Sequence, residues 1–359
     1  MRRLTATVLG ALALAASAWA QEVITLVGAG ATFPYPLMAK YGDEYTRLTG
    51  GKVRINYQSI GSGGGIRQFL EQTVHFGASD APLTDQVMKD VRTRFKTNAL
   101  NIAYALGAVV PVYNLPGVRE PLRFTGPVLA DIYLGKIKTW NDPALQDLNP
   151  NVKLPPLPIT VVHRSDGSGT TYVWVDYLSK VSPEWASKVG RGTSVQWPVG
   201  VGGKGNEGVA GVVKQTPGAI GYVEVTYAKQ NNLSYGAVQN KSGRFILADL
   251  PSIKAAANVP LPGDMRVSIT DTSEPGGYPI ASFTYLLLYE DLSANKAVKS
   301  EAEARALVEF VKWILTDGQK YNEPLTYGAL ASVPQQRALA LLSRVTYQCK
   351  PIGKEITGR

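Results

Sequence analysis

The feature that most restricts the fold is a strand, a glycine-rich turn and a helix that follow one another near the N-terminus. The apolar stretch 23–29 is typical of a strand, and the turn Gly28-Ala-Gly-Ala-Thr-Phe-Pro34 follows it. A helical pattern over 37–48, a second strand over 52–57 and the glycine turn 61–65 come next. This order favours a mostly parallel sheet with helices on its faces. In such sheets, ligands bind at the carboxyl ends of the strands, where these glycine turns lie.

A further glycine turn, His163-Arg-Ser-Asp-Gly-Ser-Gly-Thr-Thr171, lies between an apolar strand and another helical pattern. Ser168 is a natural N-cap, and the start of a helix offers unpaired N–H groups and the positive end of the helix dipole to an anion. Arg164 adds a planar fork that fits two oxygens of an oxyanion, and Asp166 is placed to hold that fork. Taken alone, the stretch is explained equally well as a glycine-rich turn that caps an ordinary helix.

All three glycine turns carry a small hydroxyl side chain near the start of the following helix. These side chains are Thr32, Ser62, and Ser168 together with Thr170. Three helix N-termini that point to one spot can hold an oxyanion through N–H and hydroxyl groups, with only one full cation. The sequence therefore predicts an anion-binding site built from these turns.

Asp80 follows the third short strand, 74–78, and is the unexpected residue of this set. A carboxylate beside an anion site repels the ligand unless the ligand has a proton to donate, because an ionised carboxylate only accepts hydrogen bonds. Phosphate carries such a proton at neutral pH and sulfate does not, so Asp80 would favour phosphate. The alternative is that Asp80 caps a helix that starts near Pro82, and spacing alone slightly favours this alternative.

Signatures of catalysis are incomplete in this chain. A nucleophile elbow requires glycine two residues before the serine, but Ile60 and Asp166 occupy those positions for Ser62 and Ser168. There are only two histidines, and no carboxylates are clustered at metal-ligand spacing. We therefore expect a binding protein without a metal or cofactor, and not an enzyme.

The first twenty residues are typical of a secretory signal peptide. A basic start, an apolar run over 6–16 and the small-x-small site Ala18-Trp-Ala20 predict export and cleavage after Ala20. The single cysteine, Cys349, allows no internal disulfide. The formal charge of +9 comes from scattered Lys and Arg residues, which favours solubility over a nucleic-acid partner.

Two long apolar runs suggest how the chain is divided. The runs 101–114 and 280–289 are long and apolar enough to carry the chain from one lobe to another and back. We therefore expect a first lobe made of 21–110 and 275–359, and a second lobe made of 111–274. The stretch 233–264 shows no strong pattern, and no structure is assigned to it.

Together the motifs resemble one known family, the phosphate-binding proteins of bacterial phosphate-specific ABC transporters. The resemblance covers nearly the whole chain after residue 20. The motifs that carry it are Gly28-Ala-Gly-Ala-Thr-Phe-Pro34, Tyr57-Gln-Ser-Ile-Gly-Ser-Gly-Gly-Gly65, Phe76-Gly-Ala-Ser-Asp-Ala-Pro82, Asp131-Ile-Tyr-Leu-Gly-Lys-Ile-Lys-Thr-Trp140, Arg164-Ser-Asp-Gly-Ser-Gly-Thr170, Gly202-Gly-Lys-Gly-Asn206 and Gly218-Ala-Ile-Gly-Tyr222.

The resemblance implies a two-lobed class II periplasmic-binding-protein fold, an α/β fold with mixed, mostly parallel sheets and a hinge between the lobes. It implies a receptor that closes on phosphate in the periplasm and delivers it to a permease pair driven by a cytoplasmic ATPase. We expect a monomer, because a hinged receptor must open freely. It also implies that Asp80 accepts the proton of the ligand and that Asp166 orients Arg164. The phosphate-binding residues carried over from the family motifs are Thr32, Phe33, Ser62, Asp80, Arg164, Ser168, Gly169 and Thr170.

Some alternatives stay open at this point. An exported phosphatase on the same scaffold requires a metal or an activated nucleophile. A receptor for sulfate or molybdate is a second alternative, but these anions have no proton to donate to Asp80. The motif Gly202–Asn206 has no assigned ligand role, and Asn206 is expected to cap a helix that begins at Glu207.

Overall fold

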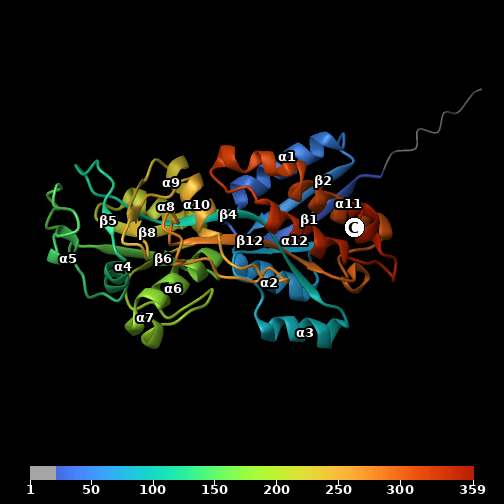
Figure 1. Cartoon of the computed structure of the whole chain (residues 1–359), viewed down its shortest axis with the longest axis horizontal. Coiled ribbons are helices and arrows are strands. Elements are labelled where there is room, and N and C mark those ends of the chain that lie inside the picture. The colour runs from blue at the N-terminus through green and yellow to red at the C-terminus, as the bar shows by residue number, and fades with distance from the viewer. Residues whose placement is uncertain (1–21) are drawn as a thin grey trace, which may run out of the picture.

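One long buried strand belongs to both halves of the molecule. In the computed structural model, which describes residues 22–359, β4 (Ala99–Tyr113) pairs with β12 (Ala281–Tyr289) through its residues 99–108 and with β8 (Ala219–Glu224) through its residues 109–113. Figure 1 shows a lobe on each side of this strand, and the first and last parts of the chain share one lobe. The predicted signal peptide at 1–20 lies outside the described residues.

The main sheet of the described residues has nine strands, in the order β2-β1-β3-β12-β4-β8-β6-β7, with β9 paired to β4. All its antiparallel pairs involve β4 or β12, and its remaining pairs are parallel. The sheet is mixed, as predicted, but its pairs are divided equally between parallel and antiparallel rather than being mostly parallel. Its strands not yet given are β1 (Ile24–Gly30), β2 (Val53–Ser59), β3 (Phe76–Ser79), β6 (Thr160–Arg164), β7 (Val201–Gly203) and β9 (Ser234–Tyr235). A separate three-stranded sheet consists of β5 (Arg123–Phe124), β10 (Ala237–Gln239) and β11 (Phe245–Ile246).

Helices cover both lobes (Figure 1). The first lobe carries α1 (Tyr35–Leu48), α2 (Ser62–Glu71), α3 (Asp85–Phe95), α11 (Glu301–Leu315), α12 (Ser332–Ser343), α13 (Ile352–Thr357) and 3-10 turns at Leu292–Ala294, Asp317–Tyr321 and Glu323–Leu325. The second lobe carries α4 (Gly126–Tyr133), α5 (Pro143–Gln146), α6 (Gly169–Val181), α7 (Pro183–Lys188), α8 (Gly205–Gln215), α9 (Val225–Gln230) and α10 (Leu250–Ala256). The stretch 233–264, which has no clear sequence pattern, contains β9 to β11 and α10.

The pattern of burial explains why the sheet joins the lobes. Every residue of β4 and β12 is buried, because helices cover both faces of the sheet at these strands. The first residue of β12, Ala281, pairs with Ala108, next to the point where β4 changes partner. β12 therefore begins where β4 changes from one set of partners to the other.

One expectation about a helix start is wrong. α3 begins at Asp85, not near Pro82, and its N-cap is Thr84, whose Oγ1 accepts a hydrogen bond from the N–H of Val87 at 3.2 Å. Asp80 directly follows β3, four residues before that cap, so it does not cap α3.

Candidate functional site

The first lobe brings its loops together at one edge of the sheet. β1 lies between β2 and β3 in parallel register, so the loops after all three strands leave from the same edge. Gly30 makes this close approach possible: its φ is +149°, and a Cβ added there would lie 1.9 Å from the carbonyl oxygen of Ala78. Thr32, Ser62 and Asp80 are all buried at this edge, with 3%, 0% and 1% of their surfaces exposed.

The second lobe contributes the end of β6 and the start of α6. Ser168 is the N-cap of α6, as predicted, and its Oγ accepts a hydrogen bond from the N–H of Thr171 at 2.9 Å. Ser168, Gly169 and Thr170 are buried. The N–H groups of the first helical turn therefore lie inside the protein without helical partners.

The two lobes meet at these two sets of residues. The N–H of Gly63 in the first lobe donates to the carbonyl of Gly167 in the second lobe at 3.0 Å. A Cβ added at Gly169 would lie 2.2 Å from Oδ2 of Asp80 and 2.3 Å from Oγ of Ser62, so only glycine fits there. The structure therefore brings together the helix starts that the sequence predicts to converge.

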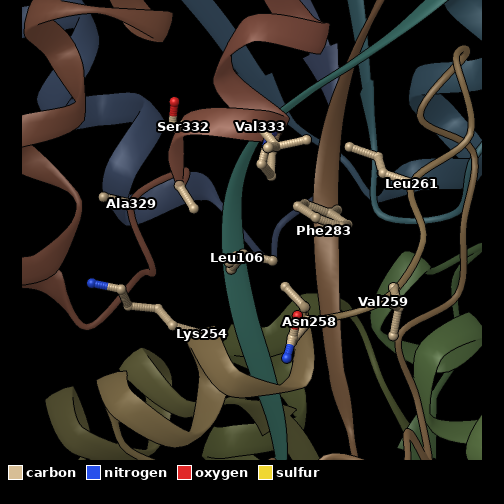
Figure 2. A pocket seen from close by; sticks show the side chains of 12 residues that line it. Leu106, Lys254, Asn258, Val259, Leu261, Phe283, Ala329, Ser332 and Val333 are labelled. Atoms are coloured by element: carbon tan, nitrogen blue, oxygen red, sulfur yellow. The ribbon is translucent and has the colours of Figure 1, made fainter.

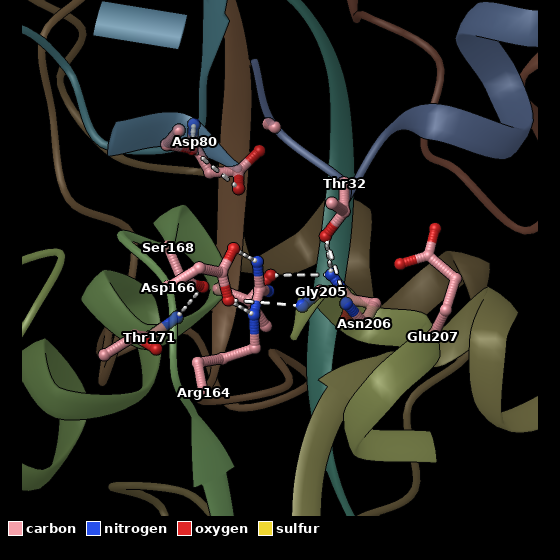
Figure 3. A network of polar contacts seen from close by, with 12 residues as sticks. Thr32, Asp80, Arg164, Asp166, Ser168, Thr171, Gly205, Asn206 and Glu207 are labelled. Atoms are coloured by element: carbon pink, nitrogen blue, oxygen red, sulfur yellow. Dashed lines mark hydrogen bonds and ion pairs between the residues drawn. The ribbon is translucent and has the colours of Figure 1, made fainter. Parts of the chain in front are cut away.

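Arg164 is held by its neighbour and keeps one donor free. Its Nε and Nη2 donate to the two carboxylate oxygens of Asp166 at 2.7 and 2.6 Å (Figure 3). Its side chain is only 1% exposed, and its Nη1 has no hydrogen-bond partner among the described residues. A buried guanidinium nitrogen without a partner is costly, which indicates a place for an anionic ligand.

Asp166 stays ionised despite its partial burial. Burial works to raise its pKa, but the hydrogen bonds and charge of Arg164 outweigh this effect and hold the pKa of Asp166 below its ordinary value. The N–H of Gly205, at the start of α8, also donates to Asp166 at 3.1 Å. Asp166 therefore fixes the guanidinium fork in the way that the sequence suggests.

Asp80 is in the opposite electrostatic situation. Burial raises its pKa to about 7, although the hydrogen bond from Thr284, the charge of Arg164 and the hydroxyl of Ser62 all favour the ionised form. Oγ1 of Thr284 donates to Oδ1 at 2.8 Å, and Oγ of Ser62 lies 3.4 Å from Oδ2. A carboxyl with a pKa near neutral exchanges a proton with a bound ligand at little cost.

Phe33 has its side chain in the core and its backbone at the cleft. The side chain is fully buried against β4, where a Cβ on Gly107 would collide with the ring. The carbonyl of Phe33 accepts a hydrogen bond from the hydroxyl of Tyr327 at 2.6 Å, and that of Thr32 accepts one from Tyr227. These two hydrogen bonds hold in place the turn at Thr32 and Phe33, which directly precedes α1.

Three residues of this site are missing from the sequence prediction. Asn206 does not cap a helix that starts at Glu207; α8 starts at Gly205, and the Asn206 side chain contacts Thr32 across the lobes (Figure 3). Thr284 supports Asp80 from β12, next to a register shift in the strand pairing. The hydroxyl of Tyr222 accepts a hydrogen bond from the N–H of Arg164 at 3.0 Å.

A separate hollow lies between α10, α12 and the central strands (Figure 2). Its volume is about 460 Å³, and the only charged side chain in its lining, Lys254, is paired with Glu323 at 2.7 Å. This hollow offers no cluster of donors for an anion. It is lined by Leu106, Lys254, Ala257, Asn258, Val259, Leu261, Phe283, Ala329, Ala331, Ser332, Val333 and Pro334.

The described residues contain neither a metal-ligand cluster nor a membrane-spanning helix. Between residues 22 and 359, no group of three or more His, Cys, Asp or Glu side chains is arranged to hold a metal ion. Over the same residues, no helix combines the length and the apolar character needed to cross a membrane.

Comparison with known proteins places the chain in a family. A family model described as a PBP superfamily domain matches residues 15–317. The phosphate-binding protein PstS of Xylella fastidiosa is 47% identical over 316 residues, which cover 87% of this chain and 83% of that protein. The PstS protein of Pasteurella multocida is 44% identical over 307 residues, 84% of this chain and 85% of the relative.

Solved structures show the same fold. A high-affinity periplasmic phosphate-binding protein solved with phosphate aligns with a TM-score of 0.71 at 18% identity, covering 93% of this chain and 97% of the other. A phosphate-binding protein from Stenotrophomonas maltophilia aligns with a TM-score of 0.64 at 16% identity, covering 88% and 92%. By its sequence identity, its domain match and its two-lobed architecture, the chain belongs to the PstS family of phosphate-binding proteins within the PBP superfamily.

Proposed function

We propose that this chain is a receptor that binds inorganic phosphate between its lobes and delivers it to an ABC import permease. The observation that carries the proposal is a pair of buried groups brought together by opposite lobes. These groups are Nη1 of Arg164, which has no hydrogen-bond partner within residues 22–359, and the carboxyl of Asp80, whose pKa burial raises and the charge of Arg164 works to lower. A cationic donor and a proton acceptor together suit an anion that also carries a proton, as phosphate does at neutral pH.

Each predicted site residue has a role in this proposal. Arg164 makes the charged contact, Asp166 orients it, and Asp80 accepts the proton of the ligand. The remaining contacts are N–H and hydroxyl donors at the three helix starts, so that most of the ligand charge is balanced by dipoles. These donors come from Thr32, Phe33, Ser62, Ser168, Gly169 and Thr170.

The family membership supports the cellular context of the proposal. The relatives are named phosphate-binding proteins, and the structurally similar protein solved with phosphate is described as periplasmic. We propose that the chain is cleaved after Ala20, acts in the periplasm as a monomer, and serves a permease pair with a cytoplasmic ATPase. In this proposal the lobes comprise 21–110 with 275–359, and 111–274, and they close about the segments near β4 and β12.

A phosphatase is less well supported by the geometry. The two histidines have structural partners: His75 contacts the N–H of Val27 and Glu303, and His163 stacks on Trp197 with ring centroids 4.7 Å apart. Neither of them contacts Asp80 or Ser62. Neither histidine is therefore placed to act as a general base beside the anion site, and residues 22–359 hold no cluster of metal-ligating side chains that could activate a nucleophile.

Calorimetric titration of protein stripped of bound anions tests the proposal. We expect one phosphate per chain, and no release of product when the same protein is incubated with a chromogenic phosphate ester, with and without divalent metal. Protein that gives no binding heat with inorganic phosphate would contradict the receptor assignment. Turnover of the ester would favour the phosphatase instead.

A further inference from the structure

The motif Gly202–Asn206 places one side chain between the lobes. Asn206 lies in the first turn of α8 and is completely buried. Its Nδ2 donates to Oγ1 of Thr32 in the first lobe at 2.7 Å and to Oγ1 of Thr170 in the second lobe at 3.0 Å. Its backbone N–H also donates to Oγ1 of Thr32, at 3.2 Å (Figure 3).

The orientation of this amide is determined by a backbone group. Oδ1 of Asn206 accepts a hydrogen bond from the N–H of Glu224 at 2.8 Å. A backbone N–H can only donate, so the oxygen of the amide must face Glu224 and the NH2 group must face the two threonines. Asn206 is therefore a donor to both hydroxyls and cannot be an acceptor for them.

This donation determines where the threonine protons go. A hydroxyl has one proton and two acceptor lone pairs. Both lone pairs of Thr32 Oγ1 are used by Asn206, and neither Thr32 nor Thr170 donates its hydroxyl proton to a protein acceptor within residues 22–359. Both hydroxyls are buried, and their protons are left for a ligand.

We infer that Asn206 is a positioning residue for the anion site: it makes the hydroxyls of Thr32 and Thr170 donors toward the ligand and links the two lobes while the ligand is bound. This inference rests on the proposed function and extends it to specificity. Two hydroxyls held as donors suit ionised phosphate oxygens. The proton of the ligand is then directed to Asp80, which accepts it.

A role in capping or ordinary helix packing does not explain these contacts. The N-cap of α8 is Lys204, which makes no side-chain capping bond, and the Asn206 amide does not bond to its own helix. Its side chain instead connects residues 174 and 36 positions away.

A double-mutant cycle tests the inference. Asn206→Ala is measured in the native background and in a Thr32→Val, Thr170→Val background, with phosphate affinity and dissociation rate as readouts. In the native background we expect affinity to fall by about tenfold or more, mainly through faster dissociation, because a link between the lobes is lost. Without the two hydroxyls, we expect the same substitution to cost less than about threefold.

Equal costs in the two backgrounds would overturn the inference, since Asn206 would then act independently of the hydroxyls. Asn206→Ser is run in parallel, because it keeps a polar side chain if the alanine variant folds poorly. Asn240→Ala is the matched control: Asn240 is a buried asparagine that bonds to the carbonyls of Pro275 and Gly277. It should lower the melting temperature without changing phosphate affinity.

The outcomes also separate this inference from the proposed function. If the native protein does not bind phosphate at all, the proposed function fails. If the native protein binds phosphate and the cycle is additive, only the role of Asn206 fails.

Discussion

The two lobes each contribute an aspartate to the cleft, and the two carboxyls are in opposite states. Asp166 in the second lobe is bonded to a guanidinium and has a lowered pKa, whereas burial raises the pKa of Asp80 in the first lobe to about 7. Two causes separate them: Asp80 is more deeply buried than Asp166, and Asp166 contacts a cation whereas Asp80 contacts hydroxyls. Asp166 therefore orients the guanidinium of Arg164, while Asp80 remains available to exchange a proton with the ligand.

Removing the cation that Asp166 holds, Arg164, should have the largest effect on phosphate affinity. We expect Arg164→Ala to weaken phosphate binding by about 2–5 kcal/mol, because a desolvated charge partner is lost and Asp166 is left without its cation. Calorimetry measures the change in affinity. Arg164→Lys keeps the charge but lacks the planar fork, so its phosphate affinity should lie between those of the native protein and the alanine variant. An alanine variant with native affinity would place Arg164 outside the binding site.

Removing the proton acceptor should change selectivity more than affinity. Asp80→Asn replaces an acceptor with an amide that can donate to sulfate, so we expect discrimination against sulfate to fall by about 1–3 kcal/mol. Phosphate affinity should fall by less than this loss of discrimination. Competition titrations of both anions give the two values, and a variant that still excludes sulfate as strongly as the native protein would disprove the carboxylate mechanism.

Neutralising the other aspartate should have a smaller effect. In Asp166→Asn the guanidinium loses an anionic partner, which strengthens its attraction to phosphate, but it is also held less firmly. Because these effects oppose each other, we expect phosphate affinity to change by no more than about 1 kcal/mol, and sulfate to remain excluded. A large loss of selectivity in this variant would remove the distinction between the two aspartates.

Glu224 is a second carboxyl whose pKa is raised by burial, but we assign it no contact with the ligand. It therefore tests whether a raised pKa alone is enough to affect phosphate binding. Burial raises its pKa from 4.5 to about 8, and its carboxyl accepts a hydrogen bond from the N–H of Thr226 at 2.8 Å. A raised carboxyl pKa means that the folded state binds the proton more tightly, so stability is lost as pH rises from 4.5 through about 8.

We therefore expect Glu224→Gln to match the native protein in acid and to be more stable by about 1 kcal/mol or more near the upper end of that range. Thermal melts across this pH range measure the difference. Phosphate affinity should change least of all four variants. Parallel pH profiles for the two proteins would show that Glu224 is ionised in the folded state.

The sequence predicted the parts of the site that depend on local structure. The pairing of Arg164 with Asp166 spans two residues, and the capping of α6 by Ser168 follows from its position before the helix. The convergence of the two helix starts in the first lobe follows from the parallel order of β1, β2 and β3, which places their loops at one edge of the sheet. The start of α6 joins them through contacts between the lobes, such as the bond from the N–H of Gly63 to the carbonyl of Gly167.

The rest of the site depends on contacts between distant parts of the chain. Thr284 lies 204 residues from Asp80, and the expectation that Asp80 caps a helix failed because Thr84 takes that position. The signal for Thr284 was a hydroxyl within an otherwise apolar run. Asn206 belonged to a visible motif, but its partner Thr32 lies in the other lobe, so only the closed arrangement of the lobes reveals its role.

The most direct test of the account is whether the cleft requires a ligand proton. Phosphate bound to the native protein is challenged with arsenate, sulfate and molybdate at a pH above the value of about 7 that burial gives Asp80. We expect arsenate to displace phosphate, while sulfate and molybdate fail even at about hundredfold excess. Displacement by sulfate or molybdate as effective as that by arsenate would contradict the account.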